Sequence, residues 1–233
     1  MINGIEGSHQ VGMNGSLIAA LRCFHGPNVF NPWSDADPLD IGSGARQRCN
    51  RLQRHLDCRA DYLLIGEASG YQGCHFSGVP FTNESLLLAD RVPRIEVRGR
   101  ISTRPRPWCE PSATVVWGRL HELGIAHRTV LWNAFAWHPH RPGEPMSNRP
   151  PTREELKLGA AVLQTILNLF AGARAVAVGR VAEAALSAAG VAVFAPVRHP
   201  AMGGANLFRE QLGALVRRRR RRWHRPRSAA ETQ

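Results

Sequence analysis

The chain has 233 residues and a mass of 25.7 kDa, which suits one α/β domain or two very small ones. Hydrophobic residues make up 43%, so a core can form, but no apolar run is long enough to cross a membrane. Thirty Lys and Arg residues against eighteen Asp and Glu give a net charge of +12, which favours a polyanionic partner such as nucleic acid.

Residues 1–59 are predicted to form an extension whose helices pack on the core. Residues 16–24 are amphipathic, and residues 44–57 place Cys49, Leu52 and Leu56 at helical spacing. The first thirty residues lack a basic start followed by an apolar block, so we expect no secretory signal and a cytoplasmic, nucleoid-associated protein with reduced cysteines. The five cysteines are odd in number and no two have the two-residue spacing typical of metal sites, so we expect no metal.

The first strand is predicted at residues 61–66, and a Gly-, Pro- and Arg-rich stretch to residue 111 follows it with one short helix at residues 84–90. Ser112 is the predicted cap of a helix that reaches Leu123. A second strand at residues 129–132 leads into a loop over residues 133–151. Thr152 and Glu155 have the spacing of a capping box, which opens a helix that reaches Phe170.

The remaining elements repeat the alternation of strand and helix. Strands are predicted at residues 175–179 and 191–196, and helices at residues 181–189 and from residue 205 to about residue 218. This order predicts an α/β fold with three α/β/α layers and a central four-stranded, mainly parallel sheet. Residues 217–233 hold eight arginines and one glutamate, so we expect a solvated, disordered tail.

Three loops follow the carboxyl ends of these strands, where ligands bind in parallel sheets. In the first, Glu67 could be a general base or could bind its own loop, and Phe81 could stack on a planar ring or fill a hydrophobic gap. In the second, Asn133 can both donate to and accept from a base edge, and His138 and His140 are candidate metal ligands or phosphate contacts. In the third, His199 could support a leaving anion.

These residues, in this order, resemble the uracil-DNA glycosylase superfamily over about residues 60–216. Gly66-Glu67-Ala68-Ser69-Gly70 is similar to its first motif, in the Gly-Glu-x-Pro-Gly form of the thermophile-type iron–sulfur branch. Residues 77–81 are similar to the segment whose aromatic residue stacks on uracil, and Asn133 matches the Asn that reads the uracil edge. His199-Pro200-Ala201 is similar to the second motif.

The resemblance implies a DNA-repair enzyme that flips uracil out of DNA and hydrolyses its N-glycosidic bond, acts as a monomer and leaves an abasic site. It implies no cofactor, because the paired cysteines of the iron–sulfur branch are absent. The implied catalytic residues are Glu67 and His199, and the substrate-binding residues are Gly66, Ala68, Ser69, Gly70, Tyr71, Phe81 and Asn133. The expected DNA-binding residues are Met202, as a wedge or a packing residue, Gly203, Gly204 and Asn206 at the start of the last helix, and Arg217 and Arg218 of the basic tail.

The sequence departs from the motif at three positions. Ser69 replaces the usual proline, and Ala68 stands where the most efficient branch has an aspartate. The tyrosine that excludes thymine in that branch falls at Gly70, so the adjacent Tyr71 is the candidate for this role. Two alternatives therefore stay open: a non-catalytic binder of uracil-containing or abasic DNA on this fold, and an α/β enzyme with a small nucleotide or carboxylate substrate.

Overall fold

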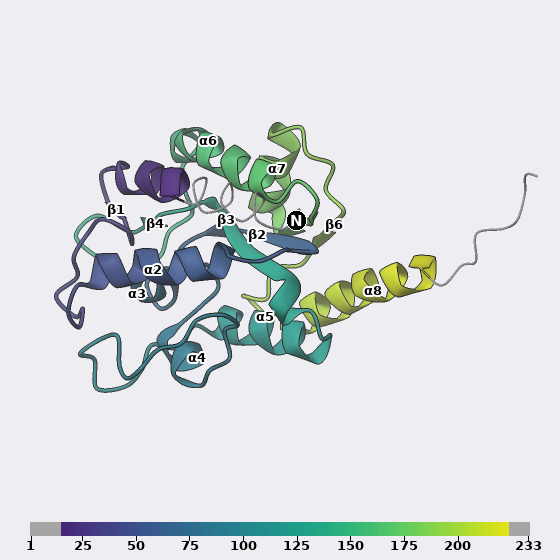
Figure 1. The fold of residues 1–233 in the computed structure, drawn as a ribbon. Helices are drawn as coiled ribbons and strands as arrows, with labels where there is room; N and C mark the ends of the chain where they lie inside the picture. Colours follow the sequence, from purple (N-terminus) through teal and green to yellow (C-terminus); the bar gives the residue numbers. More distant parts are fainter. Residues whose placement is uncertain (1–14, 224–233) are drawn as a thin grey trace, which may run out of the picture.

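The computed structural model describes residues 15–223 and is built around a four-stranded sheet (Figure 1). The strands are β2 (Tyr62–Ala68), β3 (Thr129–Phe135), β5 (Arg174–Val178) and β6 (Ala195–Val197). They lie in the order β3-β2-β5-β6, and every neighbouring pair is parallel. The predicted α/β fold with a four-stranded parallel sheet is confirmed.

Helices cover both faces of the sheet because alternate strand side chains point to opposite sides. Leu63 and Ile65 belong to the apolar cluster formed with α6 (Arg153–Leu169) and α7 (Arg180–Ala188). Tyr62 and Leu64 belong to the cluster formed with α5 (Pro111–Glu122) and α8 (Ala205–Trp223). Figure 1 shows the two pairs of helices on opposite sides of the strands, so the three predicted layers are present.

The N-terminal segment packs into the same core. Residues 15–22 are helical, and α2 spans Gly44–Leu56. Five apolar side chains of this segment are almost fully buried beside Leu63 and Ile65: Leu17, Leu21, Trp33, Leu52 and Leu56. A two-residue strand, β1 (Val29–Phe30), pairs antiparallel with β4 (His138–Pro139), a pairing that the sequence did not predict. These contacts tie the extension to the loop after β3.

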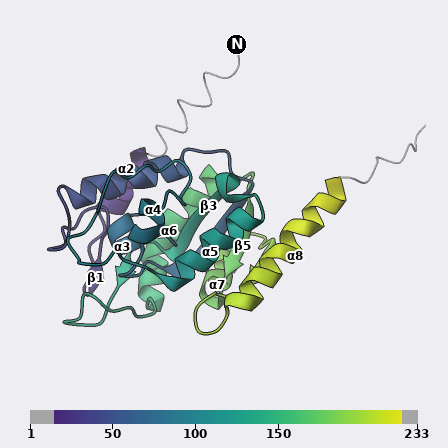
Figure 2. The same cartoon turned by 90° about the horizontal axis from the view of Figure 1, so that it is seen from below.

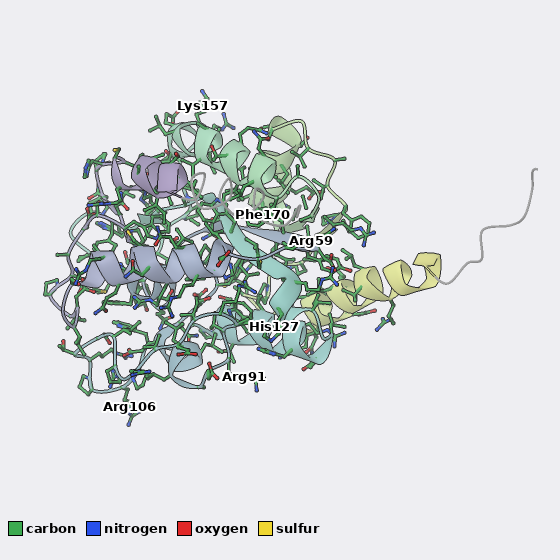
Figure 3. All side chains as sticks on the ribbon, in the orientation of Figure 1. Arg59, Arg91, Arg106, His127, Lys157 and Phe170 are labelled. Atoms are coloured by element: carbon green, nitrogen blue, oxygen red, sulfur yellow. The ribbon has the colours of Figure 1, made fainter. Side chains whose placement is uncertain are left out.

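Two arginines of α2 are structural rather than available to a polyanion. Arg48 is fully buried and donates to the backbone oxygens of Pro32 and Asp35 and to the carboxylate of Asp40. Arg51 donates to the backbone oxygens of Phe76 and Ser77. By contrast, Figure 3 shows basic side chains such as Arg91 and Arg106 directed away from the ribbon. The net charge therefore overstates the basic surface.

Several element boundaries differ from the prediction. Strands β2 and β3 continue to Ala68 and Phe135, so Gly66, Glu67 and Asn133 lie in strand ends rather than in loops. Strand β6 is limited to Ala195–Val197. Helix α5 begins at Pro111, a residue favoured in the first turn of a helix, so Ser112 lies inside the helix rather than capping it.

Other predicted elements are found as expected. The capping box of Thr152 and Glu155 is present at the start of α6. Helix α8 runs on to Trp223, so residues 217–223 of the predicted disordered tail are helical, in keeping with the good helix propensity of arginine. Figures 1 and 2 show this part of α8 extending away from the body of the molecule. The rest of the predicted tail, residues 224–233, lies outside the described residues.

Residues 66–111 contain two short helices, α3 (Cys74–Ser77), which was not predicted, and α4 (Glu84–Leu88), which was. The irregular part of this stretch is organised by the buried carboxylate of Glu84. Its oxygens accept from the side chains of Arg100 and Ser102 and from the backbone N–H groups of Ile101, Ser102 and Trp108. Glu84 therefore holds the segment before α5 in place.

We expect Glu84→Gln to lower the free energy of unfolding by about 2 kcal/mol at pH 7, because the new amide N–H group would face donors only. Burial alone would raise the pKa of Glu84, but the hydrogen bonds from Arg100, Ser102 and the backbone outweigh it and lower the pKa. The stabilisation is thus present above the unfolded-state pKa and is lost as the pH falls through the folded-state pKa. Urea unfolding of both proteins at pH 7 and at about pH 3 measures this. An equal difference at both pH values would contradict the assignment.

Candidate functional site

One cleft of about 1110 Å³ collects three segments of the chain: the end of β2 with the residues after it, the end of β3 with the residues after it, and the loop after β6. It is lined by Glu67, Ala68, Ser69 and Gly70 from the first segment and by Asn133 from the second. His199 to Gly203 line it from the third, and Phe81 closes it from the stretch between α3 and α4. The predicted convergence at the carboxyl edge of the sheet is therefore found.

Glu67 presents a carboxylate to this cleft without binding its own loop. The residue lies near the end of β2 and is half-buried, and its carboxylate accepts no hydrogen bond from any residue in the described range. Burial raises its pKa above the ordinary value for a glutamate. No hydrogen bond supports the alternative in which Glu67 holds its own loop together. The carboxylate is therefore available to a ligand or a water molecule.

Phe81 packs directly over the backbone of Gly66. A Cβ atom on Gly66 would stand 2.4 Å from the ring of Phe81 and 2.7 Å from the amide of Asn133, so only glycine fits there. Gly66 itself is buried beneath them. The Phe81 ring is 5.9 Å from the His199 ring, with 35° between their planes, and the Phe81 backbone is left-handed, with a φ of 51°. One ring face thus borders the cleft beside His199.

The amide of Asn133 is held in one orientation by the backbone around it. Asn133 is 2% exposed and pairs with Gly66 across the sheet. The orientation that satisfies both amide atoms has Oδ1 accepting from the N–H of Ser69 at 3.2 Å and Nδ2 donating to the oxygen of Trp132 at 3.1 Å. Ser69 in turn donates its hydroxyl to the oxygen of Ala136. Each amide atom of Asn133 keeps capacity for one more hydrogen bond, one as a donor and one as an acceptor.

The loop backbone fixes the tautomer of His199. The N–H of Ala201 donates to Nδ1 of His199 at 3.1 Å, which leaves Nε2 as the protonated nitrogen of a neutral ring. Burial, aided by the charge of Arg198, lowers the pKa of His199 and so favours this neutral form. Gly204 is required behind the ring, because a Cβ atom there would stand 2.0 Å from the His199 oxygen. His199 is thus a neutral donor at the wall of the cleft.

The structure also brings in residues that the sequence did not single out. Glu110 lines the cleft, and its half-buried carboxylate accepts from the hydroxyl of Ser112. Asn148 and Arg149 also line the cleft, and Asn148 lies 3.4 Å from where a Cβ atom on Gly70 would stand. Arg149 is anchored by a two-pronged ion pair with Glu155. The capping-box spacing identifies Glu155 in the sequence, but no sequence pattern predicts its ion pair with Arg149.

The predicted DNA contacts are spread over the lip of the cleft and α8. Met202 is 92% exposed, has a left-handed φ of 52°, and lines the cleft together with Gly203. Asn206 is exposed on the first turn of α8, and Arg217 is exposed farther along this helix. Gly204 is buried behind the loop, and Arg218 lies in the helix, where only its backbone is described.

Tyr71 does not line the cleft. Its ring packs edge-on against Trp108 at 5.7 Å, and its backbone N–H donates to the side chain of Asn148. Across residues 15–223, no group of three or more His, Cys, Asp or Glu side chains could hold a metal ion. The five cysteines are free and do not form the ligand set of an iron–sulfur cluster. Among the described helices, none has the length and apolar character needed to span a membrane.

Comparison with known proteins agrees with this arrangement. The family model described as "Uracil DNA glycosylase superfamily" matches residues 54–218. The fold is similar to the crystal structure of wild-type Pedobacter heparinus SMUG2, with a TM-score of 0.64 and 13% sequence identity, over 90% of this chain and 98% of that chain. No curated protein sequence matches this chain. Since the family model covers more than half of the chain, including every residue of the cleft, the protein belongs to the uracil-DNA glycosylase superfamily.

Proposed function

We propose that this protein is a uracil-DNA glycosylase, a monofunctional hydrolase that flips uracil into the cleft and leaves an abasic site. The observation that carries the proposal is one cleft that joins a free carboxylate, a fixed amide, an aromatic ring and a neutral histidine: Glu67, Asn133, Phe81 and His199. The amide would bond the adjacent carbonyl and N–H of the uracil edge, and the base would lie against the Phe81 ring.

Breaking the N-glycosidic bond places positive charge on the sugar and negative charge on the base. The Glu67 carboxylate would stabilise the cation or orient the attacking water. The hydroxyl group of this water is added to the sugar carbon, and its remaining proton passes through Glu67 or solvent to the uracil anion. The Nε2–H of His199 would donate to a uracil oxygen as that oxygen gains charge. Ala68 supplies no second acid or base, so Glu67 carries this work alone on β2.

The DNA backbone would lie along the basic lip of the cleft. Arg141 and Arg149 line one side, and α8, with Arg217 and Arg218, begins at Ala205 on the other. Positive side chains there would contact phosphates without reading sequence. Met202, at the exposed tip of its loop, would enter the base stack as a wedge. Asn148 lies against Gly70, where it narrows the base site in place of the tyrosine expected there.

A single assay tests the proposal. Oligonucleotides with one uracil, thymine, hypoxanthine, xanthine or hydroxymethyluracil, in single-stranded and double-stranded form, are incubated with the protein and then treated with alkali. We expect strand cleavage of the uracil oligonucleotide only after alkali. Retarded but uncleaved uracil DNA would instead identify a binding protein on this fold. Loss of all DNA retention at low salt when residues 217–233 are removed would favour a small-molecule enzyme.

A further inference from the structure

Three buried side chains from distant parts of the chain form a continuous run of hydrogen bonds behind the cleft wall. Asp37 Oδ2 lies 2.9 Å from His75 Nε2, and His75 Nδ1 lies 2.9 Å from His138 Nδ1. His138 Nε2 lies 2.8 Å from the backbone oxygen of Ser147. The run therefore joins the N-terminal segment, helix α3 and the loop after β3.

The surroundings exclude solvent from this run. Both rings are fully buried, and the Phe30 ring stacks on His75 at 3.6 Å with 6° between the planes. Asp37 Oδ1 accepts from the N–H of Leu39, which leaves Oδ2 to His75. The other charged or titratable groups facing the run are Arg48 and Asp40, which pair with each other, and His140, whose ring lies 5.8 Å from that of His138.

Counting protons shows what the geometry requires. Each of the three contacts needs one proton between its two atoms. The Ser147 oxygen and an ionised Asp37 can only accept, so all three protons must then come from ring nitrogens of His75 and His138. Two neutral imidazole rings carry only two. The complete run therefore holds one additional proton, either as a charged ring beside a carboxylate or as a neutral ring beside a protonated carboxyl group.

The position of the additional proton follows from the two ends of the run. Burial lowers the pKa of His138 to about 3, so this ring is neutral, donates from Nε2 to Ser147 and accepts at Nδ1. His75 must then donate from Nδ1, and the remaining proton lies between His75 Nε2 and Asp37 Oδ2. Burial lowers the pKa of His75, although its hydrogen bond to Asp37 favours the protonated ring, so this proton is the one that is lost as the pH rises.

We propose that Asp37, His75 and His138 form a latch, closed by one shared proton, that positions the wall of the cleft formed by residues 138–151. Ser147, where the run ends, directly precedes Asn148 and Arg149, which line the cleft. Removing the proton leaves one contact of the run without a hydrogen. Adding a second additional proton makes both rings cationic. The two Nδ1–H groups of His75 and His138 then face each other, so the hydrogen bond between the rings is lost. Closure therefore has an upper and a lower pH limit.

A substitution at Asp37 separates this proposal from a merely structural role. In Asp37→Asn, the amide oxygen still accepts from Leu39, and the amide N–H donates to His75 Nε2. All three contacts are then made by two neutral rings, so the latch no longer needs an additional proton. Asp37→Ala removes the contact altogether. Asp57→Asn, at an exposed carboxylate, is the matched control for the change of charge.

The measurement is amide hydrogen exchange of residues 138–151 by mass spectrometry from about pH 5 to about pH 9, corrected for the intrinsic pH dependence of exchange. In the unsubstituted chain and in Asp57→Asn, we expect protection to fall towards the alkaline end of this range, by about tenfold for one lost buried hydrogen bond. Asp37→Asn should lose the fall at alkaline pH.

Protection that stays flat at alkaline pH in the natural chain would overturn the proposal, as would the same alkaline fall in Asp37→Asn. If Asp37→Ala does not fold, the comparison of Asp37→Asn with the natural chain still tests the proposal. The readout needs no DNA, so a failure of the latch and a failure of the proposed glycosylase function are separate results.

Discussion

Replacing Glu67 by Gln is expected to lower the single-turnover rate of uracil excision by about 10²-fold or more, and His199→Ala is expected to have an effect of the same size. The glutamine side chain keeps the shape of the glutamate but can neither accept a proton nor offset the charge of the sugar. His199→Ala removes the Nε2–H donor that the backbone of Ala201 sets in place. Rates measured with enzyme in excess over DNA isolate this step from product release.

The matched control is Glu110→Gln, which changes the other half-buried carboxylate of the same cleft. We expect its excision rate to stay close to that of the natural chain. The acidic limb of the pH–rate profile should belong to Glu67, because burial raises its pKa and protonation abolishes its function. Near-normal excision by both Glu67→Gln and His199→Ala would refute the assigned roles.

Removing residues 1–59 is expected to leave a chain that does not fold, although the family match begins only at residue 54. The deletion takes away five almost fully buried apolar side chains of the segment. At about 2 kcal/mol each, their burial amounts to about 10 kcal/mol, which is the stability of an entire small domain. The loss of Arg51 would also remove the donor to the backbone oxygens of Phe76 and Ser77 in α3.

Circular dichroism and soluble yield of residues 60–233 measure this outcome. A chain that starts at Met13 is the control, because it retains every residue of the described structure. A folded, cooperatively melting fragment of residues 60–233 would show that the extension is an appendage rather than part of the core.

The sequence predicted the sheet and the cleft because both depend on local patterns. Short apolar runs ending at Gly66, Trp132 and Pro196 indicate parallel strands, and parallel strands bring their carboxyl ends to one edge. The residues placed in loops, Glu67 and Asn133, lie instead in strand ends, because the pairing of Gly66 with Asn133 and of Ala68 with Phe135 extends the ladder. Their positions are therefore more rigid than expected.

Contacts between distant residues could not be predicted in this way. Asp37, His75 and His138 are far apart in sequence, and a lone histidine in a loop carries no sign that it is buried. The sequence makes His138 a candidate metal ligand or phosphate contact, whereas the structure buries it completely. Arg48 likewise counts as surface charge in the composition but bonds backbone oxygens in the interior. Only the folded chain brings these partners together.

The length of α8 has a consequence for how much DNA the protein would cover. Its 19 residues begin with Ala205 at the cleft, and at about 1.5 Å per residue they span about 28 Å. This corresponds to about eight base pairs of duplex, at about 3.4 Å per pair. Because the arginine-rich end lies on one side of the cleft only, the footprint on DNA would be asymmetric about the flipped base, with the longer arm on the side of α8 (Figure 2).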